Sequence, residues 1–455
     1  MATDSAVVVG AGIGGLLAAR ALSETYARVT LVDRDPLPEQ ATSRRGVPQG
    51  RQLHVLLDRG RQVLEELLPG VGDELTALGA PLVDLQGQVR WYNDGYRMRP
   101  AASPLRAIGV SRPLLEQVVR NRIGALPGVT VLPGHEVAGL TATPDRRRVT
   151  GVRVHRRADG PSAAVEHTAD LVVDAGGRGT RSPVWLPALG YPPAPEEQVT
   201  VGLTYVTRLY ERQPQHLDGL LGVFTNAVPG RPRGGIVAVQ EHDRFAVALN
   251  GMFGEEPPTD DAGLIAYAES LPAPEIGALM RQARPLGEPA RMRFPASVRR
   301  RYERLRRFPA GYLVFGDALC SFNPLYGQGI TAAALQASEL ARLLRTAPDG
   351  LARRFFRRAA RVIDVPWAIA VGTDLRFAEV PGPRSVRVRL TNAYVHRLHA
   401  AATADPALGA AFLRVLNLVD PPGRLLVPAV AARVLTGSGV AVRRRDGPAE
   451  VSTHG

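Results

Sequence analysis

A glycine-rich turn near the start of the chain constrains the fold more than any other stretch. Residues 6–9 form a short apolar run rich in valine, which is typical of a buried strand. Gly10, Gly12 and Gly15 follow with the spacing G-x-G-x-x-G, and an apolar helical pattern begins at Leu16. A strand, a glycine turn and a helix in this order predict a βαβ dinucleotide-binding unit.

Each glycine has a physical role in such a unit. Gly10 lets the backbone turn off the strand, Gly12 lets it approach a pyrophosphate, and Gly15 lets helix and strand pack closely. The pyrophosphate rests on the helix N-terminus, where free N–H groups and the helix dipole favour negative charge. A second apolar strand ends at Asp33, whose carboxylate is expected to accept from a ribose hydroxyl. The cofactor-binding residues predicted from this stretch are Gly10, Gly12, Ile13, Gly14, Gly15, Asp33 and Arg34.

Two further strands run into glycine clusters. The strand over 171–174 ends at Asp174, but no long helix with a following acidic strand comes after it. We therefore expect a single nucleotide site. The other strand ends at Asp317, and the glycine-rich loop after it opens a helix expected over 331–344. This second helix N-terminus is predicted to point into the nucleotide cleft.

The rest of the chain contains further predicted helices and strands. A helix is expected over 53–68, an aromatic hairpin turns at Asn93-Asp94-Gly95, and Ser111 caps another helix. Residues 346–436 read as helical with proline breaks, the first at Pro366. The predicted fold class is α/β, with a Rossmann-like nucleotide domain over 1–80, 105–185 and 301–345, an inserted, mostly antiparallel β-sheet substrate domain over 81–104 and 186–300, a C-terminal helical region over 346–436 and a flexible tail over 437–455.

Composition excludes several classes of function. The net charge of +13 comes entirely from arginine, because the chain contains no lysine, and the arginines are scattered rather than clustered. We therefore expect no nucleic-acid binding, and no Schiff-base or P-loop lysine is available. The single cysteine, Cys320, forbids an internal disulfide. No apolar run is long enough to span a membrane and no leader is evident, so we expect a cytoplasmic protein.

The three glycine landmarks, taken in order, resemble those of the single-component flavin monooxygenases of the aromatic-hydroxylase and squalene-epoxidase superfamily. The resemblance covers about half the chain and implies FAD as the cofactor, with NADPH or NADH as electron donor, directly or through a flavin or ferredoxin reductase. In that family the Gly-Asp carboxylate holds the ribityl chain, a role that passes to Asp317. The loop after it lies along the reactive edge of the flavin, which implies that role for Pro324, Gly327 and Gly329.

The family resemblance implies further cofactor contacts. In the family, an arginine at the start of the third helix lies near the ribityl chain and phosphates, and the resemblance gives this role to Arg112. The adenine contact that the family makes from a strand backbone corresponds to Val137. The polar loop after the second strand carries Arg45, which we also count as a cofactor residue. Gly316 and Ile330 complete the predicted set. The sequence Asp174-Ala175-Gly176 departs from the family's Asp-Gly pattern, so nicotinamide binding at this place is an open question.

The loop at Pro324 looks closer to squalene epoxidase than to the phenol hydroxylases. The Arg45-Gly-Val-Pro-Gln49 loop and the Leu418-Val-Asp420-Pro-Pro422 stretch resemble bacterial polyether-type epoxidases of secondary metabolism. The function implied is oxygen transfer from a flavin hydroperoxide to an alkene of a hydrophobic polyketide or terpenoid substrate. Aromatic hydroxylation, alkene reduction of the prenyl-reductase type and a non-catalytic flavin-binding scaffold stay open as alternatives. A halogenase of this superfamily would need an active-site lysine that the chain lacks.

No side chain is assigned as catalytic, because the flavin performs the chemistry. Candidate pocket residues are His54, Tyr205, Met252, Phe322 and Trp367. Alkene epoxidation needs no side-chain base, whereas hydroxylation of a phenol gains from one. His396 and His399 are three residues apart on an expected helix, but no third ligand accompanies them, so no metal site is predicted.

Overall fold

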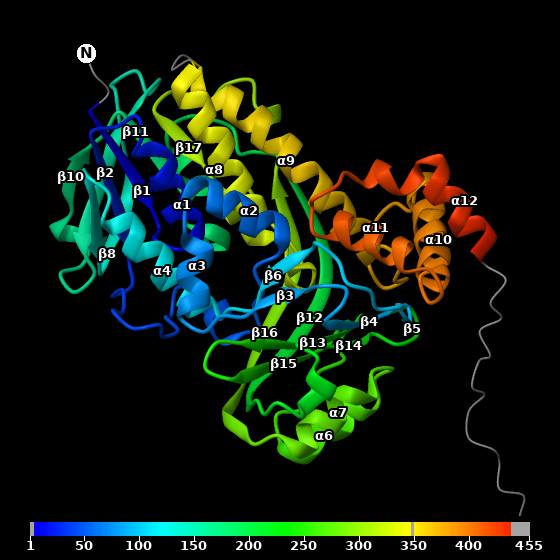
Figure 1. Ribbon diagram of the computed structural model, residues 1–455. Coiled ribbons are helices and arrows are strands. Elements are labelled where there is room, and N and C mark those ends of the chain that lie inside the picture. The colour runs from blue at the N-terminus through cyan, green and yellow to red at the C-terminus, as the bar shows by residue number, and fades with distance from the viewer. Residues whose placement is uncertain (1–3, 347–349, 438–455) are drawn as a thin grey trace, which may run out of the picture.

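A parallel five-stranded sheet forms the core of the first of two units in the computed structural model, which describes residues 4–346 and 350–437 (Figure 1). Its valine-rich strands are buried because other layers cover both faces. In spatial order the strands are β17 (Tyr312–Val314), β11 (Leu171–Asp174), β1 (Ser5–Val9), β2 (Arg28–Asp33) and β7 (Val129–Pro133).

Helices cover one face of this sheet and a small antiparallel sheet covers the other. Helix α1 packs against the sheet strands and against α4 and α8, and α9 packs on the outer side of α8. The helices are α1 (Ile13–Leu22), α4 (Arg112–Gly124), α8 (Gly329–Thr346) and α9 (Leu351–Asp374). The small sheet consists of β8 (His135–Ala142), β9 (Val149–Arg156) and β10 (Val165–Thr168).

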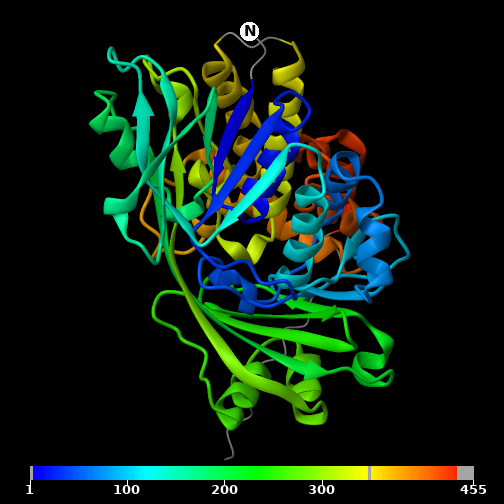
Figure 2. The same ribbon diagram turned by 90° about the vertical axis from the view of Figure 1, so that its left-hand side faces the viewer.

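An eight-stranded sheet forms the second half of the molecule. Its two longest strands, β12 and β16, run side by side from the edge of the first unit deep into the sheet (Figure 2). Helices α6 (Asp261–Glu269) and α7 (Pro274–Gln282) pack on its outer face. The order is β18 (Cys320–Ser321), β16 (Pro285–Arg300), β12 (Glu196–Glu211), β15 (Arg244–Gly251), β14 (Arg233–Gln240), β13 (Gly222–Thr225), β4 (Val89–Asn93) and β5 (Tyr96–Arg97).

Smaller elements connect these two units. The two-stranded sheet of β3 (Leu82–Asp84) and β6 (Arg106–Ile108) lies between them, and α5 (Ser182–Ala188) follows β11. Helices α2 (Asp58–Leu67) and α3 (Val71–Ala77) lie near α8 and α4, respectively. Helices α10 (Val386–Ala401), α11 (Pro406–Leu416) and α12 (Pro428–Thr436) form a separate group at the right of Figure 1.

The β4–β5 hairpin carries the point at which the C-terminal helices attach. The side chain of its turn residue Asp94, only 2% exposed, lies 2.7 Å from Arg376, 2.9 Å from His399 and 3.2 Å from His396. The charges and hydrogen bonds of His399 and Arg376 outweigh burial and hold the pKa of Asp94 well below its ordinary value. The two histidines therefore bind a buried carboxylate, and no group of metal ligands occurs among the described residues.

Most predicted elements are confirmed. The hairpin turns at Asp94 and Gly95, both with positive φ, and the Ser111 side chain accepts from the backbone N–H of Leu114 to cap α4. The expected fold class is also confirmed. Helix α8 begins at Gly329, two residues before the expected start.

Two predicted boundaries were wrong. The helix expected over 53–68 begins only at Asp58, because Leu56 exchanges two backbone hydrogen bonds with Ile108 and is therefore held extended. Pro366 does not break α9, which continues through it. A proline removes a single N–H donor, and a 24-residue helix packed on α8 tolerates that loss. Most of the predicted tail over 437–455 lies outside the described residues. No helix of the described chain has the length and apolarity needed to cross a membrane.

Candidate functional site

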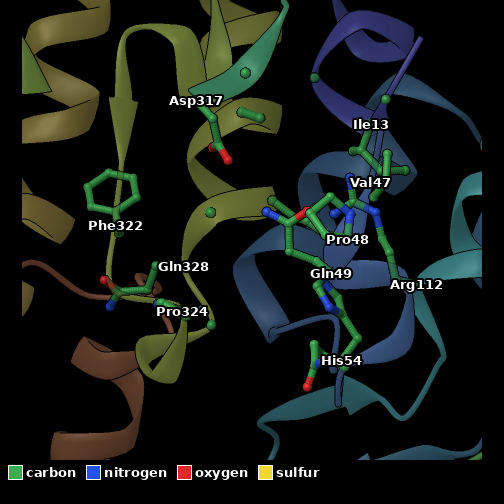
Figure 3. Close-up of a pocket in the computed structure, with 18 of the residues that line it drawn as sticks. Ile13, Val47, Pro48, Gln49, His54, Arg112, Asp317, Phe322, Pro324 and Gln328 are labelled. Atoms are coloured by element: carbon green, nitrogen blue, oxygen red, sulfur yellow. The ribbon is translucent and has the colours of Figure 1, made fainter. Parts of the chain in front are cut away.

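A cavity of about 740 Å³ lies between the two units. The carboxyl ends of β1, β2, β11 and β17 line one side of it, and the inner face of the eight-stranded sheet lines the other. Ligands of open α/β sheets bind at the carboxyl ends of the strands, and this volume is within the usual range for small-molecule sites. Figure 3 shows Asp317 pointing into this space, with Pro324 and Gln328 on one side and Arg112 and His54 on the other.

The glycine turn has the geometry that the motif predicted. Gly10 has a φ of +97° and donates its N–H to the Val32 carbonyl at 2.8 Å. A Cβ on Gly15 would lie 1.8 Å from the Gly10 carbonyl oxygen, so only glycine lets the helix approach the strand. Around Gly12 and Gly14 the space is open, apart from Arg44 Nη2 at 3.8 Å from a Cβ built on Gly12. This open cradle at the start of α1 fits a pyrophosphate group.

Asp33 lines the cavity, and its carboxylate already has protein partners. Oδ2 accepts from the Ala11 N–H at 2.7 Å, and Oδ1 accepts from the Asp35 N–H at 2.9 Å and from Arg44 Nη1 at 3.1 Å. Each carboxylate oxygen has two lone pairs, so an acceptor site at Oδ2 remains for a ribose hydroxyl. The predicted role of Asp33 therefore fits this geometry.

Arg44 lines the cavity, whereas the sequence analysis had chosen its neighbour Arg45. Its guanidinium contacts Asp33, Asp35 and Glu116, and all four side chains are at most 7% exposed. Burial alone would lower the pKa of Arg44, but the charges of Asp33, Glu116 and Asp35 raise it. Its Nη2 is buried without a hydrogen-bond partner among the described residues, beside Gly12. An unpartnered cationic donor at this place fits a phosphate oxygen.

Arg45, the arginine chosen from the sequence, is exposed and does not line the cavity. The loop sequence alone does not show which of the two adjacent arginines points into the cavity. The buried acidic residues that pair with Arg44 distinguish the two arginines only once the chain is folded.

Asp317 follows β17 in a short turn, and the conformation and hydrogen bond of Gly316 hold this turn in place. Gly316 has a φ of +66°, and its N–H donates to Gln336 Oε1 of α8 at 2.9 Å. Burial raises the pKa of Asp317, while Arg112 and Arg178 act in the opposite direction. Two cations that line the cavity therefore act on this carboxylate, where the resemblance places the ribityl chain.

The loop after Asp317 leads into the first turn of α8, and both line the cavity. Pro324, Gly327, Gly329 and Ile330 are all lining residues, and their contact with a flavin stays a prediction. Gly327 has a φ of +66°, a conformation that glycine adopts without strain. The free N–H groups at the start of α8 therefore point toward the cavity and favour negative charge there.

The remaining predicted residues divide into two groups. Val137, Arg34, Arg112, His54, Tyr205 and Phe322 line the cavity. Met252 and Trp367 do not; both are buried in the hydrophobic core instead. Cys320 is also buried, and burial raises the pKa of its thiol.

Among the lining residues, His54 and Tyr205 are candidate bases. Burial, followed by the charge of Arg112, lowers the pKa of His54 to about 3. Burial raises the pKa of Tyr205, whose hydroxyl donates to the Met292 sulfur at 3.1 Å. Near neutral pH both side chains are uncharged, and the imidazole is a weak base.

An apolar wall on the inner face of the eight-stranded sheet was not predicted. Its side chains come from five strands, so no local pattern could group them. The wall consists of Trp91, Phe224, Ile236, Ala248 and Met292.

Comparisons with known sequences give a family model and a relative. Residues 5–109 match the family model described as FAD dependent oxidoreductase. Protein Rv3254 of Mycobacterium tuberculosis is 36% identical over 444 residues, which cover 94% of this chain and 92% of that protein.

Solved structures share the fold. The flavin-dependent brominase Bmp2 has a TM-score of 0.65 at 14% identity and covers 95% of this chain and 97% of its own. A 2-methyl-3-hydroxypyridine-5-carboxylic acid oxygenase has a TM-score of 0.59 at 18% identity, covering 82% and 90%. At these identities the likeness confirms the predicted fold, and the family model supports FAD as the cofactor.

Proposed function

Because the chain belongs to the same family as Protein Rv3254 and contains an FAD dependent oxidoreductase segment, we propose that it is a flavin-dependent monooxygenase that transfers one oxygen atom of O2 to a hydrophobic small molecule. The observation that carries this proposal is that one cavity joins the glycine turn, Asp317 and the start of α8 to an apolar wall. Bound FAD would supply the activation of oxygen.

The residues on the side of the cavity formed by the parallel sheet fit FAD. The open cradle at Gly12 and the unpartnered Arg44 Nη2 suit a pyrophosphate, and Asp317 suits a polyhydroxyl chain. The start of α8 would stabilise negative charge on a reduced ring. We accordingly assign residues 1–80, 105–185 and 301–345 to FAD binding.

The substrate would lie against the apolar wall. Trp91 and Phe224 contact each other, with ring centroids 4.8 Å apart, and present an apolar surface to the cavity. Burial of a hydrocarbon chain there is favourable by about 25 cal/mol for each Å² removed from water. We propose a polyketide or terpenoid substrate, held by residues 81–104 and 186–300.

Among oxygen-transfer reactions, we propose epoxidation of an alkene. Hydroxylation of a phenol gains from a base whose pKa lies near the working pH. His54, with a pKa of about 3, and the hydrogen-bonded Tyr205 hydroxyl do not have that property, and Asp374, whose pKa is about 7, does not line the cavity. An alkene requires no such base, so the chain's residues need only bind it, orient it and exclude water.

The decisive experiment is turnover of candidate polyenes under ¹⁸O2, with NADPH or NADH supplied alone or with a flavin reductase. We expect label in an epoxide or in a cyclic ether derived from it. Label in a phenol would show the aromatic hydroxylase instead. A product two hydrogens heavier and without label would show an alkene reductase, and no product with any donor would leave a flavin-binding scaffold.

A further inference from the structure

Asp374 is a buried carboxyl group that the proposed function does not use. It is the last residue of α9 and is 1% exposed. Its Oδ1 accepts from the Tyr326 hydroxyl at 2.8 Å and from Asn323 Nδ2 at 3.1 Å. Its Oδ2 is buried with no hydrogen-bond partner among the residues that the structure describes. Both hydrogen bonds therefore converge on one oxygen, and they join residues 48 and 51 positions apart.

Both donors belong to the loop over 323–327, which lies between Asp317 and α8. Pro324 and Tyr326 line the cavity at the place where the flavin edge is expected. Asn323 is fixed within the loop as well, since its Oδ1 accepts from the Leu325 N–H at 3.1 Å. The orientation of this loop therefore depends on side-chain contacts to α9.

A third hydrogen bond joins the end of this loop to the C-terminal helices. Gln328 Nε2 donates to the Leu416 carbonyl at the end of α11, at 2.9 Å. Two residues beyond Asp374, Arg376 pairs with Asp94 of the β4–β5 hairpin. The segment 374–376 therefore contacts both the loop over 323–327 and the hairpin of the eight-stranded sheet.

We propose that Asp374 is a positioning residue that holds the loop over 323–327 against the reactive edge of the flavin, through Tyr326 and Asn323. The inference rests on the proposed function, because it assumes that FAD lies in the cavity. It gives the C-terminal helical region a role as the support of the cofactor edge.

Simple packing does not explain a carboxyl group at this position. Burying an ionisable group among apolar neighbours is unfavourable unless its polar atoms are satisfied, and only one of the two oxygens is. Burial raises the pKa of Asp374 to about 7, although the hydrogen bonds from Tyr326 and Asn323 lower it. Arg376 also acts on this pair, because its charge lowers the pKa of Tyr326 while burial and the Asp374 charge raise it. The buried carboxyl group therefore lowers the stability of the fold.

The test compares four variants of the full chain with the wild type. Asp374→Asn keeps an acceptor oxygen, Asp374→Ala removes it, and Tyr326→Phe removes one donor. Asp364→Asn is the matched control, because Asp364 is also on α9 but pairs with Arg299 away from the cavity. For each protein, the FAD-free form is titrated with FAD to obtain the Kd, and the visible circular dichroism of the bound flavin is recorded. The fraction of reducing equivalents released as hydrogen peroxide is then measured.

We expect Asp374→Ala to raise the Kd for FAD about 10-fold, as for the loss of two neutral hydrogen bonds, and to alter the flavin dichroism. Tyr326→Phe should give a smaller change in the same direction, and more hydrogen peroxide should be released by both variants. Asp374→Asn and Asp364→Asn should behave as the wild type.

Unchanged Kd and dichroism in both Asp374→Ala and Tyr326→Phe would overturn the proposal. If Asp374→Ala does not fold, Tyr326→Phe, which lacks only a hydroxyl, decides. A wild type that binds FAD but consumes no oxygen would refute the proposed function, whereas the Kd and dichroism comparison would still test Asp374.

Discussion

Arg44 Nε donates to Glu116 Oε1 at 2.6 Å and joins the loop after β2 to α4 beneath the proposed pyrophosphate site. The same guanidinium contacts Asp33 and Asp35, so one buried cation pairs with three buried carboxylates, of which Glu116 also pairs with Arg112. The loss of this cation would leave uncompensated charge in a region of low dielectric, which is far more costly than the loss of an exposed ion pair.

Arg44→Ala should therefore destabilise the protein by about 3–5 kcal/mol and abolish tight FAD binding. Arg45→Ala is the control, because Arg45 is exposed and outside the cavity. It should change the free energy of unfolding by no more than about 0.5 kcal/mol. Urea unfolding and FAD titration of both variants check this. Equal effects of the two substitutions would contradict the assignment of Arg44.

The two small residues of the first turn of α1 make a second matched pair. Gly15→Ala would place a Cβ 1.8 Å from the Gly10 carbonyl oxygen, whereas Gly14 has nothing within 4 Å of its Cβ position. We expect Gly15→Ala to give insoluble or flavin-free protein, because the helix must move away from the strand. Gly14→Ala should stay folded, and if FAD is bound over this turn its affinity should change less. Yield and flavin content after purification measure both effects, and a normal flavin content in Gly15→Ala would show that the turn adapts.

Sequence reasoning succeeded where one local segment determines the geometry. The strand, the turn at Gly10 and the helix after it are adjacent in sequence, and so are Asp317 and the start of α8. It failed where the partner is remote. Arg44 is selected over Arg45 by Glu116, 72 residues away, and the hydrogen bonds of Asp374 span about 50 residues. The apolar wall likewise collects single side chains from five strands, whose register only the folded sheet defines.

The ionisation of Asp374 should make stability depend on pH. Its pKa is about 7 in the folded state, against an ordinary value of 3.8, so between these values the folded protein binds more protons than the unfolded chain. Stability then falls as pH rises from about 4 to about 7. Asp374→Asn removes this group, so the wild type should lose on the order of 2–4 kcal/mol relative to the variant over that range.

Urea unfolding at several pH values checks the prediction, and Tyr326→Phe provides its second arm. The Tyr326 hydrogen bond lowers the pKa of Asp374, so its removal should leave the onset of the fall near pH 4 and extend the fall to higher pH. A wild type and an Asp374→Asn variant with parallel pH profiles would show that Asp374 does not titrate in this range.

His54 separates epoxidation from phenol hydroxylation. It lines the cavity, and burial together with Arg112 lowers its pKa to about 3, so the imidazole is neutral and weakly basic at pH 7. If the substrate is an alkene, His54 has no proton to remove, and His54→Asn should change kcat by no more than a few-fold, on the order of one hydrogen bond. If a phenol is the substrate and His54 is its base, the loss should reach about 10²- to 10⁴-fold in kcat. Steady-state kinetics across pH 5–9 with the product-forming substrate distinguish the two. A large loss in kcat with KM unchanged would therefore refute the epoxidase and favour the aromatic hydroxylase.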